Sequence, residues 1–218
     1  MGEINLLDLY PRTKRPIDER GKTVTEADRA IARKFGREFF DGERRQGYGG
    51  YRYDGRWKPV VKRLADYYGL TDHAAVLDVG CAKGFTLHDV KEYLPLARVA
   101  GIDVSHYAIT CAMDSVKPYL CVADASHLPF PDRSFDLVIS INAIHNLPAD
   151  LCRRAFQEIE RVSRRHKFIT VDAYRNEEEK EKMQMWNLTA LTYFDTETWK
   201  RFFKEAGYTG DYYWFIAE

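Results

Sequence analysis

Two patterns of hydrophobic positions alternate along this chain from residue 57 onward. Apolar runs of about 4–8 residues predict buried strands, and apolar residues three or four apart predict helices. The expected strands are 75–80, 98–104, 119–123, 135–142, 166–173 and an aromatic one at 212–217. The expected helices are 57–69, 84–94, 105–114, 150–163 and 195–206. This alternation is typical of an α/β domain, so we predict a doubly wound, mostly parallel sheet of six or seven strands. Its expected order is 3-2-1-4-5, with the terminal strand beside the fifth.

The N-terminal part of the chain does not follow this alternation. Its first 22 residues are polar and contain two prolines, and we expect an arm or a poorly ordered lead-in there. Residues 25–40 carry apolar side chains at helical spacing and predict one amphipathic helix. We therefore divide the chain into an N-terminal helical and loop extension, 1–58, and one globular domain, 59–218.

Residues 40–57 combine five glycines with aromatic and arginine side chains. Glycine opposes a stable helix, and a merely flexible linker would lack the large aromatic residues. We interpret residues 47–57 as a lid over a ligand site. The alternative is a surface loop whose tyrosines pack on the domain. The proposed lid residues are Tyr48, Tyr51, Tyr53 and Trp57, with Arg56 as the partner of a carboxylate.

The sequence Val-Leu-Asp-Val-Gly-Cys-Ala-Lys-Gly-Phe at 76–85 reads as a strand, a glycine turn and a helix start. A dinucleotide-binding loop would need glycine at Ala82 and Phe85, and the Gly-Lys-Ser/Thr of a phosphate-binding loop is absent. The pattern Asp-x-Gly-x-x-x-Gly fits instead, and its acid, Asp78, suits a ligand with an ammonium group. A plain βαβ unit with an incidental aspartate is the alternative. Asp103 closes the next strand, where an acid can accept hydrogen bonds from a ribose diol.

This pattern resembles the first motif of class I S-adenosylmethionine (SAM)-dependent methyltransferases, with Ala82 in place of the middle glycine. In that family the first acid and the glycine turn hold the methionine part, and the second acid holds the ribose. The resemblance extends over roughly residues 60–207 and includes Asp124 and Ala125 as an adenine-recognition segment. It implies SAM as cofactor, S-adenosylhomocysteine as product, and no metal. The implied cofactor residues are Asp78, Gly80, Cys81, Gly84, Asp103, Val104, Asp124, Ala125, Asn142 and Arg56. The glycine-tyrosine loop also resembles an unassigned bacterial subgroup of the superfamily.

Two places at the carboxyl ends of strands offer a general base. One is His145 with Asn142, and the alternative for this histidine is a structural role beside the adenosine. The other is Asp172 with Tyr174 and Arg175, and the alternative for Asp172 is a helix cap or an ion pair with Arg175. The segment that follows contains Trp186 and is expected to cover the substrate together with Arg175.

Composition narrows the class of partner. The 218 residues have a formal net charge of zero and are 45% hydrophobic, so one domain without a general affinity for nucleic acid or membrane is expected. No apolar run approaches the ~20 residues that span a bilayer. The four cysteines lie far apart and predict free thiols in a reducing, cytoplasmic setting. We predict O- or N-methyl transfer to a small molecule, such as an anionic sugar or an amino acid, by a monomer or homodimer. The alternatives are other sulfonium chemistry, which releases methylthioadenosine, and a SAM-binding module without catalysis.

Overall fold

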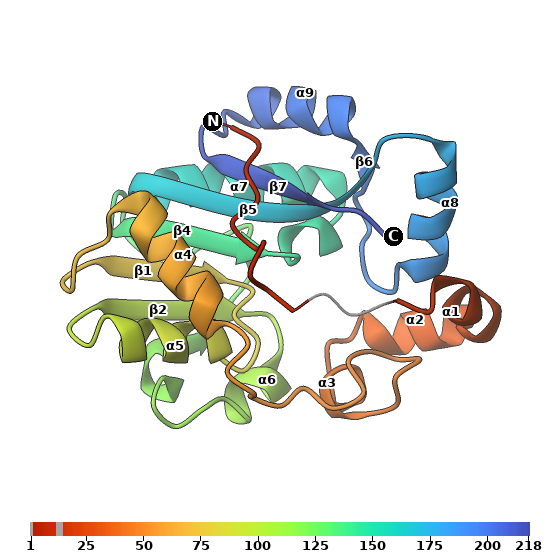
Figure 1. Cartoon of the computed structure of the whole chain (residues 1–218), viewed down its shortest axis with the longest axis horizontal. Coiled ribbons are helices and arrows are strands. Elements are labelled where there is room, and N and C mark those ends of the chain that lie inside the picture. The colour runs from red at the N-terminus through yellow and green to blue at the C-terminus, as the bar shows by residue number, and fades with distance from the viewer. Residues whose placement is uncertain (1, 12–14) are drawn as a thin grey trace.

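The computed structural model describes residues 2–11 and 15–218 and centres on a seven-stranded sheet (Figure 1). The strand order is β3-β2-β1-β4-β5-β6, and β7 also pairs with β5. All strand pairs among the described residues are parallel. The predicted order, with the glycine-turn strand in the middle and the terminal strand beside the fifth, is confirmed. The strands are β1 (Ala75–Val79), β2 (Arg98–Asp103), β3 (Leu120–Val122), β4 (Phe135–Ile141), β5 (Ser163–Tyr174), β6 (Phe194–Asp195) and β7 (Asp211–Phe215).

Helices cover both faces of the sheet, as the α/β class requires (Figure 1). On one face, α4 (Lys58–Tyr68) and α5 (Phe85–Tyr93) pack on the strands around a core that includes Leu64 and Leu87. On the other face, α7 (Ala149–Val162) and α9 (Thr196–Ala206) bury an aromatic group that includes Phe156, Trp199 and Phe203. These two apolar interfaces hold the strand ends in fixed positions. The short elements are α6 (His106–Thr110) and two 3-10 turns, η1 (Lys117–Tyr119) and η2 (Ile144–Asn146).

The last two strands of the sheet differ in length. β6 is only two residues long, and α9 lies between it and β7. Because a helix returns the chain across the sheet before β7 begins, β7 enters parallel to β5. The predicted aromatic strand at 212–217 overlaps β7.

Four further helices lie beyond the carboxyl ends of the strands: α1 (Ile17–Thr23), α2 (Glu26–Ala32), α3 (Arg37–Asp41) and α8 (Glu177–Trp186) (Figure 1). The prediction of a single helix over 25–40 was wrong. Phe35 adopts a φ of 49°, in the left-handed region, and breaks the helix before Gly36 starts α3. The predicted helix over 105–114 is also too long, since the chain turns after α6 and Met113 donates its N–H to the Lys83 carbonyl (3.1 Å).

Residues 2–11 are part of the fold. Of the two expectations for this segment, the arm agrees with the structure and the poorly ordered lead-in does not. The Leu6 side chain is fully buried beside α4 residues. The Ile4 N–H donates to the Tyr212 carbonyl (2.9 Å), and the Tyr212 N–H donates to the Gly2 carbonyl (3.0 Å). Residues 1 and 12–14 of the predicted lead-in lie outside the described residues. Within the described chain, none of the helices has the length and apolar character needed to cross a bilayer.

Candidate active site

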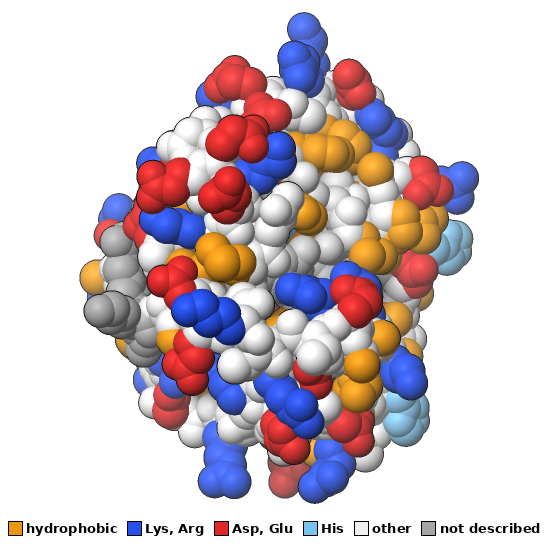
Figure 2. All heavy atoms as spheres, turned by 90° about the vertical axis from the view of Figure 1, so that its right-hand side faces the viewer, with side chains coloured by type: hydrophobic (Ala, Val, Ile, Leu, Met, Phe, Trp, Pro, Cys, Tyr) orange, Lys and Arg blue, Asp and Glu red, His pale blue; other side chains and the backbone are white. Residues whose placement is uncertain are grey.

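The carboxyl ends of the central strands open into a cleft of about 1050 Å³. Strand ends and their turns form its floor. The facing wall comes from α1, residues 33–35 after α2, α3, the loop that follows α3 and residues 186–189. Figure 2 looks onto this end of the molecule, where basic and acidic side chains are intermixed. Ligands of open α/β sheets bind at this edge. The volume is at the upper end of the roughly 300–1,000 Å³ of ligand pockets, which leaves room for a cofactor and an acceptor.

β1 runs into a tight turn at the floor of the cleft. Gly80 has a φ of 87°, and a Cβ at this position would lie 2.2 Å from the Cβ of Ala143. Ala82 also adopts the left-handed region, with a φ of 50°. The N–H groups of Gly80 and Cys81 donate to the Ile102 carbonyl (2.8 and 2.9 Å), which fixes the turn against the end of β2. The turn thus presents backbone rather than side chains to a ligand.

Asp78 and Asp103 lie side by side at the ends of β1 and β2. Burial, and then the neighbouring Asp103 charge, raise the pKa of Asp78 to about 7. No donor in the described part of the chain forms a hydrogen bond to the Asp78 carboxylate. The Asp103 carboxylate accepts the N–H groups of Ala82 and Ser105, each at 2.8 Å, while burial raises its pKa. A cation would relieve the cost of the buried Asp78 charge.

The end of β3 offers a more open part of the floor. Asp124 is exposed, lines the cleft with Ala125, and accepts the Ser126 N–H at 2.8 Å. Val104 is 61% exposed, so it presents a free apolar side chain beside Asp103. The Asp124 carboxylate is a polar acceptor and the Val104 side chain an apolar surface. Together, next to Asp103, they suit an adenine ring beside a ribose.

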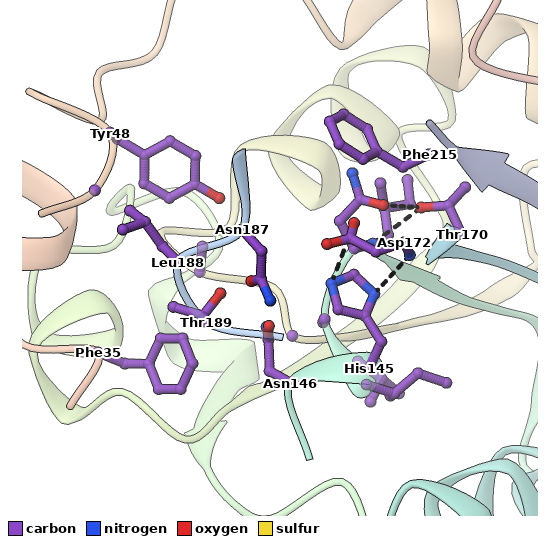
Figure 3. A pocket seen from close by; sticks show the side chains of 18 of the residues that line it. Phe35, Tyr48, His145, Asn146, Thr170, Asp172, Asn187, Leu188, Thr189 and Phe215 are labelled. Atoms are coloured by element: carbon purple, nitrogen blue, oxygen red, sulfur yellow. Dashed lines mark hydrogen bonds and ion pairs between the residues drawn. The ribbon is translucent and has the colours of Figure 1, made fainter. Parts of the chain in front are cut away.

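His145 and Asp172 form a buried pair beneath the cleft (Figure 3). The Asp172 N–H donates to His145 Nδ1 (3.3 Å), so the neutral ring carries its proton on Nε2, which lies 3.5 Å from Asp172 Oδ1. Burial lowers the pKa of His145, although the Asp172 charge opposes this. Burial raises the pKa of Asp172, although His145 and Arg15 oppose this. Trp199 Nε1 also donates to the Asp172 carbonyl (2.9 Å), which fixes the backbone of this aspartate.

A second pair stands next to it, between the ends of β4 and β5. Thr170 Oγ1 donates to Asn142 Oδ1 at 2.8 Å and accepts the Asn142 N–H at 2.9 Å. Asn142 has a φ of 52°, an uncommon conformation that asparagine tolerates better than most residues. These two bonds hold the loop after β4 against the cleft.

The loop 47–57 lies against the glycine turn. Asp41 anchors it, accepting the Tyr51 N–H (3.0 Å) on one oxygen and Lys83 Nζ (2.6 Å) on the other. Lys83 Nζ also donates to the Tyr51 carbonyl (2.9 Å). The Tyr51 ring stacks on Phe85, with centroids 4.7 Å apart and planes inclined by 15°. Tyr48, Tyr51 and Trp57 thereby line the cleft.

Comparison with known proteins agrees with this geometry. Residues 77–171 match the family described as "Methyltransferase domain". This part of the chain is therefore similar to methyltransferase domains. It is 30% identical over 128 residues to tRNA (carboxymethyluridine(34)-5-O)-methyltransferase of Arabidopsis thaliana, a match that covers 57% of this chain and 29% of that protein. It is 38% identical over 92 residues to malonyl-[acyl-carrier protein] O-methyltransferase of Hahella chejuensis, covering 41% of this chain and 32% of that one.

The solved structure of the YcgJ protein from Bacillus subtilis shares the fold. Its TM-score is 0.56 at 17% sequence identity, over 67% of this chain and 66% of that chain. The matched segments span about a third of the length of the two curated methyltransferases. The comparisons therefore point to a methyltransferase domain, and the cofactor and the acceptor have to be argued from this chain's own residues.

Several of the predicted site residues do not face the cleft. Tyr53 is turned toward α5, where its hydroxyl donates to Asp89 (2.5 Å). Gly84 packs against Val116 and Leu120 and so supports the turn from behind. The Tyr174 ring lies under Lys180, 5.7 Å from its Nζ. None of the three is among the described residues that line the cleft.

Two predicted arginines line the cleft but already have carboxylate partners. The Arg56 guanidinium is paired with Asp54 through Nε and Nη2. The Arg175 guanidinium is paired with Glu179 (2.6 Å) and Glu218 (3.1 Å), and not with Asp172. A ligand carboxylate at either arginine would have to displace these partners or share the guanidinium with them.

Sequence reasoning missed Lys83, Asp41 and Thr170. Lys83 lies inside the glycine turn. A lysine buried there needs an anionic partner, so the sequence could have indicated that such a partner exists. Its partner Asp41 is 42 positions away, and nothing in the spacing connects the two. The segment after α8 also contributes more than expected, because Asn187, Leu188 and Thr189 line the cleft, as Asn146 does (Figure 3).

Proposed function

We propose that this chain transfers a methyl group from SAM to an oxygen or nitrogen atom of a small molecule, with Asp172 as the general base. The observation that carries the proposal is one cleft with two separate sets of acids. Asp78, Asp103 and Asp124 occupy the ends of β1 to β3, where the superfamily holds its cofactor. Asp172, supported by His145, faces the same cleft from β5.

The residues on the floor of the cleft fit SAM. The unpartnered Asp78 carboxylate suits the methionine ammonium group, and the Asp103 oxygens keep lone pairs for a ribose diol after accepting two N–H groups. When bound, SAM would supply a methyl group for in-line attack by an acceptor atom, with S-adenosylhomocysteine as the leaving group. The task of the protein is to align the acceptor and to remove its proton.

Asp172 is the better base of the two candidates. The His145 side chain is only 4% exposed, and both of its ring nitrogens are engaged by Asp172, so neither is free to take a proton from a substrate. The Asp172 carboxylate lies at the cleft and is free to accept a proton from a hydroxyl or an ammonium group. His145 acts through Asp172 as a positioning residue, because its Nε2 proton holds the carboxylate and stabilises its charge.

A small acceptor is favoured by the walls of the cleft. Tyr48, Tyr51 and Trp57 of the loop and Asn187 to Thr189 of the segment after α8 border the space above the floor. The tRNA and carrier-protein acceptors named for the two relatives belong to those proteins. With a net charge of zero, this chain lacks the general positive charge that favours nucleic acid.

Incubation of the protein with SAM and fractionated metabolites tests the proposal. Acceptor-dependent release of S-adenosylhomocysteine is expected. Release of methylthioadenosine instead would point to intramolecular sulfonium chemistry, and SAM binding without turnover in any fraction would favour a binding module.

Replacing Asp103 by alanine is expected to weaken SAM binding by about 1–3 kcal/mol, because the ribose hydroxyls lose their acceptor. Isothermal titration of SAM into both proteins measures this directly. Val104→Ala serves as a neighbouring control and should weaken binding less, since it removes only part of an apolar contact. Unchanged SAM affinity in the Asp103 variant would remove this residue from the cofactor site.

The loop 47–57 offers a matched pair of variants for the lid hypothesis. Tyr51 and Tyr53 both pack on Phe85, but only Tyr51 lines the cleft. We expect Tyr51→Ala to lower turnover at least about tenfold, roughly 1.4 kcal/mol in the barrier, because water then reaches the reacting atoms. Tyr53→Ala should lower thermal stability and leave turnover within about twofold. Equal effects of the two variants on turnover would show that the loop only packs on the surface.

A further inference from the structure

Acidic side chains at the strand ends and a separate group of basic side chains both line the cleft. Acids occupy its floor, at the strand ends. Basic side chains occupy the facing wall, which comes from the N-terminal helices and the loop after α3. The wall residues are Arg15, Arg20, Arg33, Lys34 and Arg44. The acidic floor matches a cationic cofactor, whereas the proposed methyl transfer assigns no task to this basic wall.

Three of these arginines gather around the Trp186 ring at the end of α8. The guanidinium carbons of Arg20, Arg15 and Arg44 lie 4.7, 5.7 and 5.9 Å from the centre of the indole. Burial, and then the charges of Arg44 and Arg29, lower the pKa of Arg20 to about 10. Guanidinium groups gathered around one ring repel one another, and a bound anion would offset this repulsion.

Arg20 and Arg44 differ from Arg33, Arg56 and Arg175 of the same cleft in the groups that they bind. Arg33 is bound by Glu26 at 2.8 Å, and Arg56 and Arg175 also have carboxylate partners. Arg20 Nε instead donates to the Trp186 carbonyl (2.9 Å), and Arg44 Nη1 donates to the Gly47 carbonyl (2.6 Å). In residues 2–11 and 15–218, no carboxylate lies within ion-pair distance of either. Backbone carbonyls orient the two guanidinium groups and leave their charges uncompensated.

This arginine group, Arg15, Arg20 and Arg44, is adjacent to the general base. Arg15 is one of the charges that act on the Asp172 carboxyl group. Its guanidinium also lies 4.5 Å from the centre of the Phe215 ring, and Phe215 pairs with Asp172 across β7 and β5. A molecule that reaches from Asp172 to Trp186 would therefore place one end at the base and the other at the arginines.

We propose that Arg20 and Arg44 bind a carboxylate or phosphate group of the methyl acceptor beside Trp186. Guanidinium groups bind both anions through paired N–H donors, so the acceptor class is a small organic acid or a phosphorylated metabolite. The assignment of this anion to the methyl acceptor rests on the proposed methyl transfer. The anion site itself is defined by the arginines and can be measured without any turnover.

Titration calorimetry with inorganic phosphate and with malonate, at constant ionic strength set by sodium chloride, tests this site. We expect saturable binding of one anion per chain, weakened at least tenfold in Arg20→Gln and in Arg44→Gln. Arg33→Gln is the charge-matched control from the same wall and should stay within twofold of the original protein. Tighter binding of phosphate assigns a phosphorylated acceptor, and tighter binding of malonate assigns a carboxylic acid.

Unchanged anion affinity in Arg44→Gln, or no saturable binding to the original protein, overturns the proposal. Arg44 is exposed, so this variant decides the question if Arg20→Gln does not fold. SAM affinity is measured in the same samples. Loss of anion binding with SAM affinity unchanged supports the site, and a parallel loss of both overturns it. Failure of the original protein to bind SAM would contradict the proposed methyl transfer and leave the anion result standing.

Discussion

Asp172→Asn should lower kcat by about 10²–10³-fold, once an acceptor is identified, and leave SAM affinity within about twofold. The amide keeps the shape of the carboxylate but cannot take the acceptor's proton, and general-base catalysis contributes roughly 10²–10⁴-fold. Steady-state release of S-adenosylhomocysteine measures kcat, and titration calorimetry measures cofactor affinity. A kcat within threefold of the original protein would mean that the acceptor needs no base or that the base lies elsewhere.

The pH profile separates the base from its positioning residue. Burial raises the pKa of Asp172 above the usual carboxyl range, and the base is active when ionised, so kcat/KM should fall as the pH drops through that pKa. His145→Leu removes the Nε2 proton that stabilises the carboxylate. The acidic limb should then move to higher pH by roughly one unit, since a hydrogen bond to a charged group contributes about 1.5–3 kcal/mol. A purely structural histidine would lower stability without moving this limb.

SAM affinity should depend on pH through Asp78. The pKa of this carboxyl is about 7 in the free protein, and a bound ammonium group favours its ionised form. Below pH 7 the apparent Kd should therefore rise about tenfold per pH unit, and above pH 8 it should be constant. Near pH 7, calorimetry in two buffers of different ionisation enthalpy should show release of about half a proton per SAM bound.

Asp78→Asn should abolish this pH dependence and weaken SAM binding by about 10–100-fold at pH 8. Asp124→Asn is the control and should keep the dependence, because it leaves Asp78 in place.

The raised pKa of Asp78 also predicts that the Asp78→Asn variant is more stable than the original protein at alkaline pH. The ionised carboxylate is disfavoured by burial, so the contribution of Asp78 to stability falls as the pH rises from about 4 to about 7. The asparagine variant should accordingly melt at a higher temperature at pH 8. A pH-independent Kd in the original protein would contradict the assignment.

The strands and the glycine turn could be predicted because their signals are local. Val76 to Gly84 carries both the buried strand and the break after it in one short stretch, and apolar periodicity places the helices on either side. The order of the strands followed from the resemblance of this stretch to a known superfamily. The Phe35 break could not be predicted, because the amphipathic spacing continues across it and Phe35 has no intrinsic preference for the left-handed region.

The walls of the site were harder to predict than the floor, because long-range pairs decide them. Tyr51 and Tyr53 carry the same signal in the sequence and both contact Phe85 in the structure. The hydrogen bond from the Tyr53 hydroxyl to Asp89 is what turns Tyr53 away from the cleft. The choice of Arg56 as an anion partner overlooked Asp54 two positions earlier. The sequence could not single out Arg20 and Arg44 as an anion site, because their distance from carboxylates is a property of the folded chain.

The bonding of residues 2–4 to β7 bears on how the molecule behaves at high concentration. An exposed edge strand offers a row of free N–H and C=O groups to any other extended chain, and self-association through such edges is a common route to aggregates. Here the N–H and the carbonyl of Tyr212 are already bonded to Gly2 and Ile4. This part of the sheet edge is therefore closed by the protein itself, and a second copy could pair with it only after the arm had been displaced.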